Sequence, residues 1–244
     1  MSEERTGTLV LVATPIGNLA DLSMRAVEEL KRANLILCED TRHSATLFRH
    51  YDISTPTTSY GSHNIRGKIP WILEQLRLGH RVALVCDAGT PGISDPGSVL
   101  ARQAMDEGFK VEAIPGASAI VMALVLSGLP TDRFVFDGFL PHKKGRQTRL
   151  KELAVEPRTI VLYESPHRIL KTLAELQEYL GDRQAAIARE LTKVYEEVRR
   201  GTLSELLAHF TSHAVRGEFV LIVAGTDYRQ RKGDENPTGM DDLP

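Results

Sequence analysis

Cysteine and long apolar runs are scarce in this chain of 244 residues. Only Cys38 and Cys86 are present, which excludes a disulfide framework, and their spacing is not that of zinc ligands. Each lies at the end of an apolar strand-like run, where a buried thiol behaves as a small hydrophobe. No apolar run approaches the roughly 20 residues that a membrane-spanning helix requires. We therefore expect neither a metal site nor a membrane segment.

A signal peptide and a strong net charge are also missing. The first residues, MSEERTG, contain no apolar core, so we expect a cytoplasmic protein. The formal net charge of −2 argues against a uniformly basic nucleic-acid binder. A local basic run does occur, because His142–Lys151 contains five Lys or Arg residues and no acid. Such a run is typical of a solvated helix start or of a surface that contacts phosphates.

Several common ligand-binding motifs are absent. The chain has no GxxxxGK[ST] loop, and only Gly17 stands where a dinucleotide fingerprint requires three glycines. It also has no HExxH metal motif and no GxSxG nucleophile elbow. A P-loop nucleotidase, a zinc protease and a serine hydrolase are therefore disfavoured.

Three apolar strand-like runs in the first half each end in a Gly/Pro turn that leads into a helix-like segment. Thr8–Ala13 is followed by TPIGNLADLS, Val82–Cys86 by DAGTPGISDPG, and Val111–Ile114 by PGASA. In an open parallel sheet, the loops after the carboxyl ends of the strands lie along one edge, where ligands bind. Three such loops in one domain predict a single small-molecule site.

The order of strand and helix patterns predicts an α/β protein with two domains. In residues 1–128, strands and helices alternate, which predicts a mostly parallel sheet with flanking helices. Residues 129–226 contain neighbouring strand-like runs, one of them Val194–Arg200, and predict a mixed sheet with helices. Residues 227–244 have almost no apolar content, which predicts a disordered tail.

The loop sequences resemble those of a known family. The motifs occur in the order TPIGNLADLS, CEDTRHS, DAGTPGISDPG, PGASA, YESPHR, ARELTK and GEFVLIVAG. Together they resemble the tetrapyrrole methylase superfamily, and within it the ribosomal RNA small subunit methyltransferase I group. The resemblance implies a homodimer whose subunits bind S-adenosylmethionine in a cleft between two α/β domains. It also implies 2′-O-methylation of a cytidine ribose in the decoding region of small-subunit ribosomal RNA.

The resemblance, carried over position by position, implies a set of residues that bind the methyl donor. In the first domain these are Pro15, Ile16, Gly17, Asp87, Ala88, Gly89, Thr90, Ile93, Ser118 and Ala119. In the second domain Glu164 and Leu191 match positions on the adenine and ribose side. Thr90 departs from the family pattern, because many members have aspartate there.

Methyl transfer to a ribose hydroxyl favours a base or a hydrogen-bond acceptor near the nucleophile. The catalytic candidates are Asp87, Glu190 and Lys193. Asp87 follows a strand and either accepts the hydroxyl proton or caps its own loop. Glu190 and Lys193 form either an ion-pair network or, through the lysine, a contact with RNA phosphate.

Basic residues near these motifs are candidates for RNA binding. They are Arg42, Lys143, Lys144, Arg146, Arg149, Arg168 and Arg189. Two alternatives stay open beside an RNA methyltransferase. The first is a tetrapyrrole or corrinoid C- or N-methylase of the same superfamily, and the second is a noncatalytic RNA-binding assembly protein.

Overall fold

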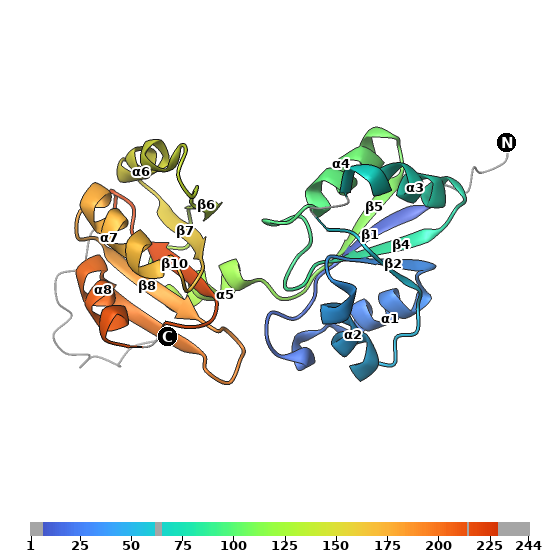
Figure 1. Cartoon of the computed structure of the whole chain (residues 1–244), viewed down its shortest axis with the longest axis horizontal. Coiled ribbons are helices and arrows are strands. Elements are labelled where there is room, and N and C mark those ends of the chain that lie inside the picture. The colour runs from blue at the N-terminus through green and yellow to red at the C-terminus, as the bar shows by residue number, and fades with distance from the viewer. Residues whose placement is uncertain (1–6, 62–64, 214, 229–244) are drawn as a thin grey trace, which may run out of the picture. The chain divides into compact units, whose positions relative to one another are not determined.

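The computed structural model describes residues 7–61, 65–213 and 215–228. Its contacts divide the chain into two units. The N-terminal unit comprises Met1–Met122 and Arg189–Glu197, and the C-terminal unit comprises Ala123–Ala188 and Val198–Pro244 (Figure 1). The domain boundary expected after residue 128 stays a prediction. The tail expected at 227–244 lies outside the described residues, apart from 227 and 228.

The N-terminal unit contains a five-stranded parallel sheet, as its alternating pattern predicts. Its strands are β1 (Thr8–Val12), β2 (Leu35–Cys38), β3 (Thr57–Ser59), β4 (Arg81–Val85) and β5 (Lys110–Ile114). They lie in the order β3-β2-β4-β1-β5, and every neighbouring pair is parallel. The carboxyl ends of the five strands therefore share one edge, and the loops that follow them start there.

Helices cover both faces of this sheet (Figure 1). The elements are the short 3-10 helix η1 (Leu19–Asp21) and the helices α1 (Met24–Arg32), α2 (Thr41–His50), α3 (Ile65–Arg77) and α4 (Gly97–Asp106). Successive strand residues point to opposite faces. Val10 accordingly packs in the core beneath α1 and α2, and Leu9 packs in the core beneath α3 and α4. Among the helices in the described part of the chain, none is long and apolar enough to cross a membrane.

The C-terminal unit contains the mixed sheet that its sequence predicts. Its strands are β6 (Phe134–Phe139), β7 (Thr159–Glu164), β8 (Gln184–Arg189), β9 (Glu197–Thr202) and β10 (Phe219–Val223), in the order β6-β7-β10-β8-β9. β6 is parallel to β7, whereas β10 is antiparallel to it. Helices α6 (Arg146–Ala154), α7 (Ile169–Leu180) and α8 (Leu203–Ser212) share one apolar core with this sheet. Helix α5 (Ala119–Ser127) contains the point where the chain passes from one unit to the other.

The strand expected at Val194–Arg200 is wrong in its first half. β9 begins only at Glu197, and Val194 and Tyr195 are 92% and 75% exposed. The backbone N–H of Lys193 donates to the carbonyl of Glu190 at 3.0 Å, which closes a turn. The apolar residues that suggested a strand therefore belong to the loop between β8 and β9.

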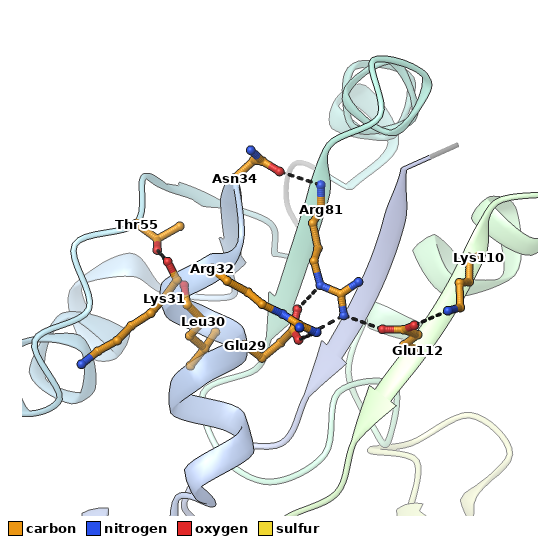
Figure 2. Close-up of polar contacts among 9 residues, drawn as sticks. All are labelled: Glu29, Leu30, Lys31, Arg32, Asn34, Thr55, Arg81, Lys110 and Glu112. Carbon is orange, nitrogen blue, oxygen red and sulfur yellow. Dashed lines mark hydrogen bonds and ion pairs between the residues drawn. The ribbon is translucent and has the colours of Figure 1, made fainter. Parts of the chain in front are cut away.

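An ion-pair network lies at the amino end of the parallel strands, opposite the loop edge (Figure 2). Arg81, the first residue of β4, pairs with Glu29 of α1 and with Glu112 of β5. Burial raises the pKa of Glu29, which is 2% exposed, but hydrogen bonds from Arg81 and Arg32 outweigh this and leave the pKa below its ordinary value. Lys110 and Arg81 lower the pKa of Glu112 to about 2. The network therefore links α1 to two strands by charge.

Candidate functional site

The loops after β1 and β4 are joined by hydrogen bonds at the carboxyl edge of the N-terminal sheet. The backbone N–H of Thr14 donates to the carbonyl of Gly89 at 2.8 Å, and the N–H of Gly89 donates back at 3.1 Å. The Thr14 hydroxyl, which is buried, also donates to the carbonyl of Cys86 at 3.1 Å. These bonds fix the first two Gly/Pro loops side by side. Sequence reasoning missed Thr14, whose position directly after an apolar strand was the available signal.

The loop after β5 packs against the same two loops. A Cβ atom on Gly116 would lie 2.8 Å from the Cβ of Ala13, so only glycine permits this approach. The Thr90 hydroxyl donates to the carbonyl of Ala117 at 3.4 Å. The three loops are thus in mutual contact, which confirms the prediction that they gather at one edge.

Asp95 shapes the long loop after β4. Its carboxylate accepts hydrogen bonds from the backbone N–H of Gly92 at 2.8 Å and of Gly97 at 2.6 Å. Within this loop Ser94 has a φ of +60°, a left-handed conformation that costs a non-glycine residue about 1 kcal/mol or more. Sequence reasoning also missed Asp95, although an Asp-Pro pair before a helix is a recognisable turn signal.

Carboxylates surround these loops at the ends of β2 and β4. Asp40 caps α2 by accepting from the backbone N–H of Arg42 at 2.8 Å, and the paired Arg42 guanidinium lowers the pKa of Asp40 to about 2. The carboxylate of Asp87 accepts from the backbone N–H of Asp40 at 3.1 Å. Burial, followed by the charge of Asp87, raises the pKa of Glu39. This edge of the sheet therefore carries negative charge.

Residues 189–197, which contain the ARELTK motif from its arginine onward, belong to the N-terminal unit and pack on the loop after β1. Glu190 and Thr192 both have left-handed backbones, with φ values of +51° and +64°. Such strain persists only where the surroundings hold it, and it concentrates at functional sites. Lys193 pairs with Glu190 at 2.9 Å. The buried hydroxyl of Thr192 has no hydrogen-bond partner among the described residues.

Gly17 is the contact between this segment and the first loop. A Cβ atom there would lie 2.8 Å from the Thr192 hydroxyl oxygen and 2.9 Å from the carbonyl oxygen of Leu191. We expect Gly17→Ala to displace residues 189–197 and to weaken the binding of S-adenosylmethionine at this edge by about tenfold or more, because overpacking costs about 1–3 kcal/mol and about 1.4 kcal/mol is tenfold in affinity. Calorimetry with S-adenosylmethionine measures this loss of affinity. Gly67→Ala, where an added Cβ meets nothing within 4 Å, is the matched control. Equal affinities in both variants would contradict the expectation.

Most of the residues predicted to bind the donor lie together at this edge. They are Pro15, Ile16, Gly17, Asp87, Ala88, Gly89, Thr90, Ile93, Ser118, Ala119 and Leu191, all in the N-terminal unit. Glu164 is placed differently, since it ends β7 in the C-terminal unit and its side chain is 0% exposed. Its carboxylate accepts from the Thr172 hydroxyl at 2.7 Å and from the backbone N–H of Ser165 at 2.8 Å.

The residues predicted to bind RNA fall into two environments. Arg42, with a side chain that is 90% exposed, lies in the N-terminal unit, as does Arg189, which pairs with Glu197 at 3.6 Å. The others lie in the C-terminal unit: Lys143, Lys144, Arg146, Arg149 and Arg168. Lys143 and Lys144 are exposed, whereas Arg146 is only 5% exposed and Arg149 pairs with Asp137 and Glu152.

The loop edge fits a small ligand that combines an apolar ring with positive charge. The backbone of Gly89 has a φ of +83°, and an added Cβ would meet its nearest neighbour only at 3.6 Å. The carboxylates of Glu39 and Asp87 favour a cation, and the side chain of Ile93, which is 46% exposed, offers an apolar contact. S-adenosylmethionine, with its sulfonium, ammonium and adenine, has this chemistry.

Comparison with known proteins decides the family. The family model for tetrapyrrole (corrin/porphyrin) methylases matches residues 8–207. The chain belongs to this family. It is 50% identical to the ribosomal RNA small subunit methyltransferase I of Synechocystis sp. over 97% of this chain and 86% of the relative. The protein of that name from Thermotoga maritima is 44% identical over 91% of this chain and 100% of the relative.

Solved structures agree with this assignment at the level of the fold. A cobalt precorrin-4 methyltransferase superposes with a TM-score of 0.68 at 17% identity, covering 90% of this chain and 95% of that one. A diphthine synthase superposes with a TM-score of 0.71 at 14% identity, covering 89% of each chain. The chain thus has the two-domain tetrapyrrole methylase fold. Its family and its curated relatives make it a methyltransferase.

Proposed function

We propose that this chain transfers a methyl group from S-adenosylmethionine to small-subunit ribosomal RNA, at the ribose 2′-oxygen of a cytidine in the decoding region. The observation that carries the proposal is an identity of 44–50% to relatives named ribosomal RNA small subunit methyltransferase I, over at least 90% of this chain. The three joined Gly/Pro loops support it, because they form a ligand edge without the sequence motifs of a P-loop or of a zinc protease.

The N-terminal unit holds the methyl donor in this proposal. Ile93 contacts an apolar part of the donor, the backbone of Gly89 allows its close approach, and Asp87 favours its positive charge. S-adenosylmethionine supplies a methyl group that is already activated by its sulfonium. The loops contribute by holding the reacting atoms in line, which can lower a barrier by roughly 7–11 kcal/mol.

Asp87 acts on the nucleophile in the proposed reaction. A ribose hydroxyl is a poor nucleophile, and Asp87 accepts its proton as the methyl group is transferred. The bond from the backbone N–H of Asp40 to the Asp87 carboxylate, 3.1 Å long, keeps one carboxylate oxygen oriented. Lys193, paired with Glu190 at 2.9 Å, contributes positive charge that balances the phosphates of the substrate.

The remaining features of the proposal concern the substrate and the assembly. Lys143 and Lys144 of the C-terminal unit contact RNA phosphates, and Arg42 adds an exposed cation in the N-terminal unit. The chain acts as a homodimer in the cytoplasm, where ribosomal RNA is the substrate. No metal takes part in the transfer.

Mapping of ribose methylation tests the proposal. Mass spectrometry of small-subunit ribosomal RNA is expected to show one 2′-O-methylcytidine that disappears when the protein is removed and returns when it is supplied again. A second arm offers tritiated S-adenosylmethionine with either ribosomal subunits or a tetrapyrrole. Transfer to the tetrapyrrole alone would replace the proposal with the ring-methylase alternative. Donor binding without transfer to either would favour a noncatalytic assembly protein.

A further inference from the structure

A buried polar network in the C-terminal unit holds the start of the basic run. Arg146, the first residue of α6, is 5% exposed although its guanidinium is charged. Its Nε donates to Glu175 at 2.8 Å, its Nη2 donates to the Thr172 hydroxyl at 2.7 Å, and its Nη1 donates to the carbonyl of Pro141 at 3.0 Å. All three guanidinium nitrogens therefore donate inside the protein.

The guanidinium of Arg168 binds the same loop. Its Nη2 donates to the carbonyl of Leu140 at 2.5 Å, and its Nη1 lies 3.2 Å from Nε2 of His142. Its Nε lies 3.2 Å from the buried carboxylate of Glu164, which also accepts from Thr172. Two guanidinium groups thus bind two consecutive main-chain carbonyls where β6 leads into the loop.

The loop held by this network faces solvent and contains two lysines. Residues 141–145 are exposed, and the side chains of Lys143 and Lys144 have no hydrogen bond or ion pair within the described part of the chain. An exposed loop with long side chains loses conformational entropy when it is ordered on binding. A loop that is already fixed avoids part of this loss. Burying Arg146 and Glu164 is costly unless both are fully bonded, and the contacts described above satisfy both groups.

We propose that Arg146 and Arg168 are positioning residues, which hold residues 141–145 so that Lys143 and Lys144 contact adjacent phosphates of a single RNA strand. The inference rests on the proposed function and deepens it. Lys143 and Lys144 touch the RNA, whereas Arg146 and Arg168 act by positioning these two lysines. Glu164 and Thr172 belong to the same network, which gives Glu164 a role in the C-terminal unit.

The charge-conserving substitution Arg146→Lys separates positioning from direct contact. A lysine keeps the charge but cannot bond to three partners as the planar guanidinium does. The assay measures transfer from tritiated S-adenosylmethionine to small ribosomal subunits purified from cells that lack the protein. We expect the KM for subunits to rise roughly three- to tenfold, with unchanged kcat and unchanged calorimetric affinity for S-adenosylmethionine. If Arg146 instead contacted a phosphate directly through its charge, the KM of Arg146→Lys would stay near that of the unaltered protein.

A double-mutant cycle with Lys143→Ala/Lys144→Ala decides the inference. The lysine pair is expected to raise the KM and to reduce the salt dependence of binding by about 1.4 in slope, or ~0.7 for each phosphate that is no longer neutralised. Arg146→Lys should then add little in the lysine-free background, because its effect passes through those lysines. Fully additive effects would overturn the inference.

Controls separate this result from unfolding and from a general reduction of positive charge. If thermal melting shows that Arg146→Lys does not fold, Arg168→Lys takes its place in the same cycle, since its side chain is 17% exposed. The double variant Arg25→Ala/Lys31→Ala removes two exposed cations of the N-terminal unit and should leave the KM unchanged. An equal rise in that control would overturn the inference. If the unaltered protein methylates no subunits, the proposed function itself fails, and the inference fails with it.

Discussion

Replacing Asp87 with asparagine is expected to slow methyl transfer by about 10²–10⁴-fold, the usual contribution of acid–base help. In the unaltered protein the Asp87 carboxylate accepts a hydrogen bond of 3.1 Å from the backbone N–H of Asp40. Asparagine keeps an oxygen that can accept this bond. The fold and the joined loops should therefore survive, whereas the proton acceptor is removed. Single-turnover rates at saturating donor and ribosomal subunits measure the effect.

The control for Asp87 is the same chemical change at a surface position. Asp106→Asn on α4 alters a side chain that is 59% exposed and pairs with Arg102. Its rate and melting temperature should match those of the unaltered protein. A near-normal single-turnover rate for Asp87→Asn would remove Asp87 from the reaction and leave it as a loop support.

Replacing Arg81 with methionine is expected to lower the free energy of unfolding by about 3–5 kcal/mol, the cost of breaking a buried ion pair from one side. Glu29 is 2% exposed and would lose a bidentate partner while it keeps Arg32 (Figure 2). Chemical denaturation measures the change. Donor affinity of the folded variant should not change, because the network lies at the opposite edge of the sheet from the loops.

Two variants test the cause of the Arg81 effect. Arg102→Met breaks an exposed pair with Asp106 and should change stability by less than about 0.5 kcal/mol. Adding Glu29→Leu to Arg81→Met removes the buried carboxylate that has lost its bidentate partner, and it should restore part of the stability. A destabilisation below about 1 kcal/mol for Arg81→Met alone would show that the network contributes little.

Much of the fold was predictable because it depends on local pattern. The alternation of strand and helix patterns predicted the parallel and mixed sheets, and the turn residues after β1, β4 and β5 predicted loops on one edge. The pattern failed at Val194 and Tyr195, since apolar character indicates a strand only where the side chains find a surface to pack on. These two side chains remain exposed in a turn.

The candidate site was only partly predictable, because its supports join residues far apart in the chain. Thr14 bonds to Gly89 and Cys86, and the Asp87 carboxylate accepts from the backbone N–H of Asp40 across 47 positions. The hydrophobic pattern of the sequence does not reveal such long-range hydrogen bonds. The roles predicted for the catalytic, donor-binding and RNA-binding residues stay predictions that the variants above test.

The sequence by itself determined the order of strands and helices, the Gly/Pro turns and the family. Hydrophobic periodicity and turn chemistry depend on residues that are close together in the sequence, so the sequence alone reveals them. Only the tertiary structure decided which charges are available to a substrate. Lys143 and Arg146 are similar cations in one basic run, yet one faces solvent and the other is buried against Glu175 and Thr172. The difference arises because helix α7 places hydrogen-bond acceptors, Glu175 and Thr172, next to Arg146.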